Sequence, residues 1–370
     1  MFSEHIKKYS WDEVHEAIYA KTSHDVEVAL SKRKCNLEDM MALLSPAAEV
    51  YLEQFASKSK NLTVQRFGKT IQLFAPMYLS NECLNVCTYC GFSFGNKIPR
   101  KTLSEKEMQT EFEFLKAGKF EHLLLVTGED AVHANPRYIS NSISLAKKYF
   151  ADVSIEVQPL NEVEYSMFKE SGCDSVLVYQ ETYNPETYKL YHLKGKKANY
   201  SYRLDTPDRI GKAGMNKIGL GVLLGLDDWR TDAFFLALHL NYLEKTYWQT
   251  RYSISFPRLR PAEGVASVKY PVSDKEFVQL LCAFRIFDNE VEVSLSTREP
   301  EYMRNHLINI GVTTMSAGSK TNPGGYAASP ETLEQFEISD SRTPEQILEL
   351  IQQQGYEPVW KNWDKALTAH

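Results

Sequence analysis

The chain has 370 residues, of which 43% are apolar and 24% are charged, so intrinsic disorder is excluded as its main state and one large or two ordinary domains can form a core. The net charge of -6 and the isoelectric point near 5.9 disfavour a nucleic-acid partner, because there is no basic excess to neutralise phosphates. The segment from Met1 to Ser10 is polar and no apolar run follows it. We therefore expect no signal peptide, no membrane span and a cytoplasmic location.

The first 70 residues predict helices without a strand. Ser10-x-x-Glu13 is a capping box that predicts a helix beginning at Trp11, and Asn36 can cap a second helix that runs through Leu44. We assign residues 1–70 to an N-terminal helical extension.

From residue 71 onward, short apolar runs alternate with amphipathic segments. Three of the amphipathic segments begin with capping boxes, Ser104-x-x-Glu107, Asn161-x-x-Glu164 and Ser273-x-x-Glu276, and further helices are expected at 136–149, 206–213, 231–245 and 300–310. The apolar runs predict eight strands, at 72–79, 122–127, 153–158, 175–180, 217–224, 251–257, 291–297 and 312–316.

Strict alternation of strand and helix implies a parallel sheet, and eight such units match the size of a (β/α)8 barrel of the TIM type, which we place at residues 71–320. A doubly wound open sheet is the alternative, but no Gly-rich dinucleotide-binding turn follows the first strand. Residues 321–370 contain a turn at Asn322-Pro323-Gly324-Gly325 and a capped helix from Thr343 to Gln353. We expect this C-terminal tail to pack on the barrel as a cap.

Six cysteines in a chain of this size do not form a disulfide scaffold. Cys35, Cys173 and Cys282 are scattered and are expected to be small buried hydrophobes. The other three form Cys83-x3-Cys87-x2-Cys90, in a loop directly after the first predicted strand. Three thiolates suit zinc or an iron-sulfur cluster, and the absence of a nearby fourth Cys or His in the sequence points away from a closed structural zinc site. A cubane cluster with three protein ligands leaves one iron open for a further ligand.

The C-x3-C-x2-C spacing, with Tyr89 before the third cysteine and a (β/α) barrel around it, resembles the radical S-adenosylmethionine superfamily. Other stretches narrow the resemblance to the 2-iminoacetate synthases, the tyrosine lyases of thiamine biosynthesis, and it covers nearly the whole chain. These stretches are Leu125-Val126-Thr127-Gly128-Glu129, Val178-Tyr179-Gln180-Glu181-Thr182-Tyr183, Lys217-Ile218-Gly219-Leu220-Gly221, Ser255-Phe256-Pro257-Arg258-Leu259-Arg260-Pro261 and Ser296-Thr297-Arg298-Glu299.

The resemblance implies a four-iron four-sulfur cluster on Cys83, Cys87 and Cys90, with S-adenosylmethionine as the second cofactor. It implies that a 5′-deoxyadenosyl radical starts the cleavage of the Cα–Cβ bond of L-tyrosine, which gives p-cresol and the 2-iminoacetate used to form a thiazole. It also implies a flavodoxin- or ferredoxin-type electron donor, with a thiazole synthase as the protein partner.

Barrel enzymes carry out their chemistry at the C-terminal ends of the strands, where the notable polar residues of this chain are expected. By resemblance, Glu129 and its neighbours contact the methionine amino group of the nucleotide, Glu181 accepts hydrogen bonds from the ribose, and the Arg203 fork pairs with the methionine carboxylate. Glu156 is a secondary candidate for these carboxylate roles. The expected nucleotide-binding residues are Tyr89, Thr127, Gly128, Glu129, Glu156, Glu181, Arg203, Gly219 and Gly221.

These assignments have plain structural alternatives. A single carboxylate is more often a solvated loop residue. Gly219 and Gly221 are expected to let the backbone approach the adenine, although a glycine in a strand often marks only a bulge.

Arg298 is expected to follow the seventh barrel strand and to bind the carboxylate of the substrate, with Ser316 and Ser319 as nearby hydrogen-bond donors. The alternative for Arg298 is an ion pair with Glu299 or Glu301 at the rim of the barrel.

Three other functions are open. A hydrogenase-maturation tyrosine lyase would carry a second cysteine cluster near its C-terminus, and no cysteine follows Cys282. A tryptophan lyase would keep the same cluster and carboxylate anchor with a different aromatic pocket. A non-catalytic iron-sulfur or zinc module would explain the three thiols, but would leave Glu129, Glu181 and Arg298 without a role.

Overall fold

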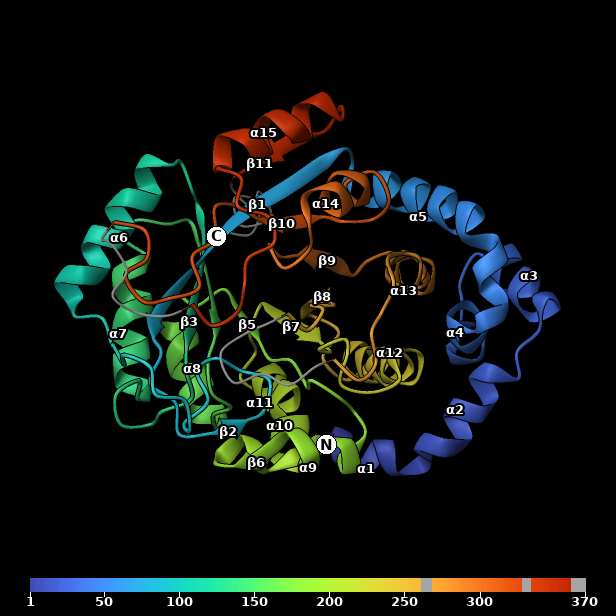
Figure 1. The fold of residues 1–370 in the computed structure, drawn as a ribbon, viewed down its shortest axis with the longest axis horizontal. Helices are drawn as coiled ribbons and strands as arrows, with labels where there is room; N and C mark the ends of the chain where they lie inside the picture. Colours follow the sequence, from blue (N-terminus) through green and yellow to red (C-terminus); the bar gives the residue numbers. More distant parts are fainter. Residues whose placement is uncertain (261–267, 328–333, 361–370) are drawn as a thin grey trace.

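A computed structural model describes residues 1–260, 268–327 and 334–360. In this part of the chain, eight parallel strands form a closed barrel (Figure 1). The pairing of Gln72 with Thr314 and of Phe74 with Ser316 joins the last barrel strand to the first. This closure confirms the (β/α)8 prediction and excludes the open sheet. The barrel strands are β1 (Thr70–Ser80), β3 (His122–Thr127), β4 (Asp152–Glu156), β5 (Ser175–Leu177), β7 (Lys217–Gly221), β8 (Arg251–Ser255), β9 (Glu292–Leu295) and β10 (Thr314–Ser316).

Helices surround the barrel, and their starts follow from side-chain caps. The boxes at Ser104, Asn161 and Ser273 are confirmed, since each side chain accepts from the third helical residue, which in turn accepts from the cap. Ser10 makes only half of the predicted box, accepting from the Glu13 N–H at 3.5 Å. The barrel helices are α6 (Glu105–Ala117), α7 (Pro136–Ala146), α8 (Glu162–Glu170), α9 (Pro185–Tyr191), α10 (Tyr200–Leu204), α11 (Thr206–Lys212), α12 (Trp229–Thr246), α13 (Asp274–Phe287) and α14 (Glu301–Leu307).

The N-terminal segment packs on one side of the barrel (Figure 1). Phe2 is fully buried, where its ring stacks on His239 at 3.8 Å and its N–H donates to Asp208. The long helix of this segment packs against α13, and Phe55 and Ser59 are among its buried residues. The helices are α1 (Phe2–His5), α2 (Trp11–Tyr19), α3 (Ser23–Ser31), α4 (Leu37–Leu44) and α5 (Leu52–Phe67).

Two strand pairings were not predicted. A small antiparallel sheet joins β2 (Val86–Cys87) to β6 (His192–Lys194). After α15 (Pro344–Gln353), β11 (Glu357–Val359) pairs in parallel with the first residues of β1. Residues 328–333 and 361–370 of the expected C-terminal cap lie outside the described residues.

Several strands end earlier than predicted. The strand expected at 175–180 ends at Leu177, and the one expected at 291–297 ends at Leu295. The backbone then leaves regular pairing, and Glu181 takes a φ of 73°. Glu181 and Arg298 therefore lie in the loops that follow the strands, where their side chains turn into the barrel mouth. No helix in the described residues is long and apolar enough to cross a membrane.

Candidate active site

A cavity of about 180 Å³ opens at the carboxyl ends of the barrel strands. Eleven of the predicted residues and both predicted serines line it, whereas a larger hollow of about 660 Å³ at the amino ends holds none of them. In barrel enzymes the carboxyl end is the catalytic one. The predicted residues in the cavity are Cys83, Cys87, Tyr89, Cys90, Thr127, Gly128, Glu129, Glu156, Glu181, Arg203, Arg298, Ser316 and Ser319.

The loop that carries the three cysteines is held by contacts along its length. Cys87 lies in β2 and its N–H donates to Ser93 Oγ at 3.1 Å. The Leu84 N–H donates to the Glu129 carbonyl at 3.1 Å. A Cβ at Gly128 would lie 2.2 Å from the Glu82 carbonyl oxygen, so only glycine allows the loop after β3 to approach this closely.

The three thiols suit a cluster better than a single zinc ion. A single metal ion needs ligand atoms that lie close together. Among the described residues, the ligand atoms of Glu82, Asp130 and His133 lie within 4.8 Å of one another, and those of the three cysteines do not. One tetrahedral zinc would draw its thiolates together, whereas a cubane holds each thiolate on a separate iron. Burial raises the pKa of Cys83 to about 11 and raises that of Cys87 further, so these thiols would need a bound metal to become thiolates at neutral pH.

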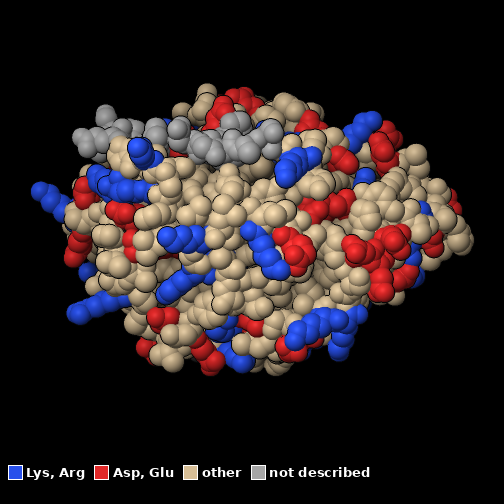
Figure 2. All heavy atoms as spheres, turned by 60° about the horizontal axis from the view of Figure 1, so that its bottom comes forward, with Lys and Arg blue, Asp and Glu red and all other residues tan. Residues whose placement is uncertain are grey.

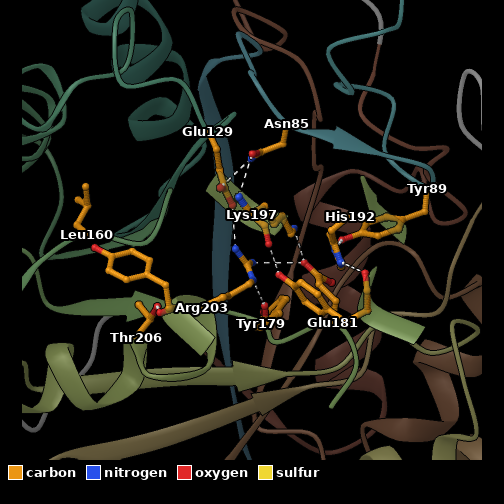
Figure 3. A network of polar contacts seen from close by, with 12 residues as sticks. Asn85, Tyr89, Glu129, Leu160, Tyr179, Glu181, His192, Lys197, Arg203 and Thr206 are labelled. Atoms are coloured by element: carbon orange, nitrogen blue, oxygen red, sulfur yellow. Dashed lines mark hydrogen bonds and ion pairs between the residues drawn. The ribbon is translucent and has the colours of Figure 1, made fainter. Parts of the chain in front are cut away.

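A network of buried charges lies beside the cysteine loop (Figure 3). Arg203, on α10, donates from Nη1 to Glu129 at 2.8 Å and from Nε to the Tyr179 carbonyl at 2.7 Å. Lys197 Nζ donates to Glu181 at 2.7 Å, and Arg203 Nη2 lies 3.4 Å from the same oxygen. The network therefore joins the ends of two strands to the segment that follows α9.

Charge pairing keeps Glu181 ionised in spite of its burial. Burial by itself would raise the pKa of Glu181, but Lys197 and Arg203 outweigh this and hold it below the ordinary value. The left-handed backbone of Glu181 is uncommon for a residue with a side chain, and such conformations gather at functional sites.

Tyr89 is fixed by a second chain of hydrogen bonds. Its hydroxyl lies 2.7 Å from His192 Nε2, and His192 Nδ1 lies 2.8 Å from the Tyr188 carbonyl. Burial lowers the pKa of His192 to about 3, so the ring is neutral, with Nδ1 donating to the carbonyl and Nε2 accepting from Tyr89.

Arg298 lines the cavity, and its guanidinium has no polar partner among the described residues. Its planar group stacks 3.4 Å from the centre of the Phe336 ring and makes no hydrogen bond or ion pair with the described residues. The predicted alternative partners are engaged elsewhere: Glu299 pairs with Arg258, and Glu301 lies 3.9 Å from Arg342. The rim ion pair is therefore not formed.

Other polar groups in the cavity also lack partners. The hydroxyls of Thr127, Ser316 and Ser319 are buried without a hydrogen bond from the described residues. The Glu156 carboxylate makes none either, and burial, followed by repulsion from Glu181, raises its pKa to about 7. Because buried polar groups are normally hydrogen-bonded, these orphaned atoms fit a site that receives a polar ligand.

Gly219 and Gly221 lie in β7 but do not line the cavity. A Cβ on Gly219 would lie 2.5 Å from the Leu177 side chain, and one on Gly221 would lie 2.8 Å from the Tyr179 ring. Both glycines make room for neighbouring side chains, and their contact with adenine stays a prediction.

Several residues of the site were not predicted. Lys197 and Asn85 complete the charge network, since Asn85 Nδ2 donates to Glu129 at 2.8 Å. Gln335 accepts from the Tyr78 hydroxyl at 2.7 Å, and its own amide lies 3.7 Å from Cys90 Sγ. The Lys-Gly-Lys-Lys run at 194–197 was a visible signal for Lys197, but no sequence pattern marks Gln335.

Comparison with known families shows to which class of enzyme this site belongs. The family model of the radical SAM superfamily matches residues 77–237, and that of the biotin and thiamin synthesis associated domain matches residues 255–357. With the closed barrel and the three-thiol loop, these matches define a radical S-adenosylmethionine enzyme, whose cofactors are a four-iron four-sulfur cluster and S-adenosylmethionine.

Full-length relatives narrow the class. The chain is 48% identical over 367 residues to the 2-iminoacetate synthase of Escherichia coli (strain K12), covering 99% of this chain and 97% of that protein. It is 47% identical, with the same coverage, to the 2-iminoacetate synthase of Salmonella typhimurium (strain LT2). The chain belongs to the 2-iminoacetate synthase family.

Solved structures agree with this placement. A crystal structure of HydG, a maturase of the [FeFe]-hydrogenase, matches with a TM-score of 0.91 at 31% identity and covers 96% of this chain and 81% of that one. Methylornithine synthase (PylB) matches with a TM-score of 0.72 at 18% identity, covering 90% and 97% of the two chains, and this likeness shows the fold alone.

Proposed function

We propose that this enzyme cleaves the Cα–Cβ bond of L-tyrosine to 2-iminoacetate and p-cresol, with 5′-deoxyadenosine and methionine as the other products, and so supplies the thiazole of thiamine. Family membership supports the reaction. The observation that carries the assignment of the site is the unpaired Arg298 guanidinium, which shares one cavity with the three thiols. A non-catalytic metal module has no use for this cation.

The cofactors set what the protein must do. When bound, the reduced cluster cleaves S-adenosylmethionine to methionine and a 5′-deoxyadenosyl radical, which takes a hydrogen from the substrate. Cys83, Cys87 and Cys90 hold the cluster in this proposal. The chain has to orient both ligands and keep water away from them.

The buried charge network is the proposed nucleotide site. Glu129 accepts from the methionine ammonium group, and Arg203, which keeps N–H donors to spare, pairs with the methionine carboxylate. Glu181 accepts hydrogen bonds from the ribose hydroxyls, and the hydrogen bond from Lys197 holds the Glu181 carboxylate in place. Thr127 supplies a hydroxyl that makes no hydrogen bond within the described part of the chain. The network is preorganised, because its charged groups hold one another in place through direct contacts (Figure 3).

The substrate is placed on the other side of the cavity. Arg298 binds the carboxylate of tyrosine, since no described residue pairs with its guanidinium and its stacking on Phe336 fixes the plane of the fork. The orphaned hydroxyls of Ser316 and Ser319 are donors at the same end. Apolar and aromatic side chains that line the cavity, Phe74, Tyr78, Leu124, Leu177 and Tyr179, form the pocket for the aromatic ring.

Anaerobic turnover tests this function directly. The reconstituted enzyme is supplied with S-adenosylmethionine, dithionite and either tyrosine or tryptophan, and the aromatic product is identified by mass. We expect p-cresol from tyrosine in step with 5′-deoxyadenosine. Product from tryptophan alone would reassign the substrate, and nucleotide cleavage without any aromatic product from either amino acid would reject the lyase.

The proposal includes two statements about cellular context. A thiazole synthase is the protein that receives 2-iminoacetate, because an imine of this kind hydrolyses if it is released into water. The cytoplasm is the proposed location, because the free thiols and an oxidant-sensitive cluster need a reducing compartment.

A further inference from the structure

Four large apolar side chains stand exposed beside the cysteine loop. Leu84 directly follows Cys83, Phe94 comes shortly after Cys90, and the two side chains are 47% and 54% exposed. Leu190 and Leu193, at the end of α9 and in β6, are 64% and 59% exposed. Contiguous exposed apolar surface of this kind marks an interaction site on a soluble protein.

The fold brings these two segments into one surface. In the small sheet, Val86 pairs with Lys194, and Lys194 Nζ lies 5.9 Å from the centre of the Phe94 ring. At Gly195, where φ is 95°, a Cβ would lie 2.1 Å from the Asn85 side chain. The segment from 190 to 196 is therefore packed directly on the loop that carries Cys83 and Cys87.

This surface is basic in a chain that is acidic as a whole. Residues 84–101 and 187–203 contain no Asp or Glu, although the chain has 48 acidic and 42 basic residues. Lys97, Lys194 and Lys196 are exposed and make no ion pair with the described residues. Figure 2, which brings this side of the molecule forward, shows lysine and arginine side chains across its centre with uncharged surface between them, and acidic side chains to the right of the centre.

We propose that the basic apolar face, formed by Leu84, Phe94, Lys97, Leu190, Leu193, Lys194 and Lys196, docks an acidic one-electron carrier protein that reduces the cluster. One electron leaves the carrier and enters the cluster, and no bond is made or broken. The proposal rests on the proposed function only in assuming a cluster on Cys83, Cys87 and Cys90.

Charge and position select this partner. The face is formed by the loop that holds the proposed cluster ligands and by the segment paired with it, so a carrier seated there lies beside that loop. Lysines around an apolar centre attract an acidic partner and speed its encounter, which suits the small, weak interfaces of electron-transfer complexes. Among the described residues that line the substrate cavity, none belongs to this face.

The test measures binding apart from turnover. The cluster-loaded enzyme is titrated with a purified acidic flavodoxin in a calorimeter at several salt concentrations. The variant Lys194→Glu/Lys196→Glu reverses two charges on the face. Lys34→Glu/Lys60→Glu is the matched control, because both lysines are exposed on the N-terminal helical segment and carry the same charge change. Leu193→Ser tests the apolar part of the face without a change of charge.

We expect the Lys194/Lys196 variant to raise the flavodoxin Kd about tenfold or more at low salt, with a smaller difference at high salt because ions screen the attraction. Leu193→Ser should also weaken binding, and the control pair should not. The rate of cluster reduction can be measured by the change in cluster absorbance. In the face variants this rate should fall when flavodoxin hydroquinone is the reductant and stay unchanged when dithionite is, which separates docking from the chemistry of the site.

An unchanged flavodoxin Kd in both the charge-reversal and Leu193→Ser variants overturns the proposal. It is also overturned if the face proves to bind anionic phospholipid vesicles or a second copy of this chain while flavodoxin binds elsewhere. Normal nucleotide cleavage with dithionite in the same variants would leave the proposed function standing in each of these cases.

Discussion

The Arg203 guanidinium and the Glu129 carboxylate meet at 2.8 Å, although 74 positions separate them in the sequence. Both side chains are largely buried, and each is held by a further partner, the Tyr179 carbonyl for Arg203 and Asn85 for Glu129. The pair therefore ties the end of β3 to α10. The same contact that shapes the proposed nucleotide site therefore also contributes to the stability of the fold.

Removing one member of this pair should cost stability as well as binding. In Arg203→Met, Glu129 keeps Asn85 and Glu181 keeps Lys197, so we expect a loss near the low end for a broken buried pair, about 3 kcal/mol. Urea unfolding of the cluster-loaded protein measures it. The double variant Arg203→Met/Glu129→Gln should recover part of the loss, and strictly additive losses would show that the two groups are not coupled.

Alanine variants of the three loop cysteines should differ in iron content from alanine variants of the other three cysteines. Cys83→Ala, Cys87→Ala and Cys90→Ala should each lose the cluster, because two thiolates cannot hold the cubane that three were built to hold. Cys35, Cys173 and Cys282 are buried away from the cavity, so their alanine variants should keep full iron and cost only packing stability. Iron analysis and the visible spectrum of anaerobically purified protein decide between these outcomes.

Glu156 should make the stability of the protein depend on pH near neutrality. Its pKa is raised from 4.5 to about 7 by burial and then by Glu181. Between these values the folded chain keeps a proton that the unfolded chain has released, so this group lowers stability as pH rises. Glu156→Gln removes the effect.

The gain in the unfolding midpoint of Glu156→Gln over the parent should therefore grow from pH 5 to about pH 7 and stay constant from there to pH 8. Denaturant unfolding of the cluster-loaded protein at four pH values measures this. A difference that is flat across the range would show that the Glu156 carboxyl titrates at its ordinary pKa.

The barrel could be predicted because its signals are local. Each strand is an apolar run bounded by a turn, and boxes such as Ser104-x-x-Glu107 mark the helices between them. The pairings of β2 with β6 and of β11 with β1 involve two or three residues each, and such short strands carry no periodicity.

The site could be predicted only where spacing or strand order places a residue. The cysteine triplet is recognisable from its C-x3-C-x2-C spacing, and Glu129 is recognisable because it follows a strongly apolar strand. Lys197 reaches Glu181 from a loop whose path depends on tertiary packing, and Gln335 reaches Cys90 from the C-terminal segment, 245 positions away. Contacts of that separation leave no mark in a single sequence.

Arg298 carries the most specific prediction, because its guanidinium is unpaired as far as the structure describes the chain, and its plane is fixed by Phe336. A bidentate pair with the substrate carboxylate orients the amino acid in a way that the point charge of a lysine does not. Arg298→Lys should keep the cluster and the cleavage of S-adenosylmethionine, and should lose p-cresol formation by roughly a hundredfold, as expected for a reactant displaced by about 1 Å.

The measured quantity is the ratio of 5′-deoxyadenosine to p-cresol in the variant and in the parent. We expect it to rise, because radical formation continues while lysis fails. Arg342→Lys is the matched control, since Arg342 pairs with Asp340 away from the cavity and its variant should keep the parent ratio. The same ratio in Arg298→Lys as in the parent, with normal affinity for tyrosine, would mean that another group anchors the carboxylate. Arg258 is a poor substitute for that role, because Glu299 and Asp274 already hold its guanidinium.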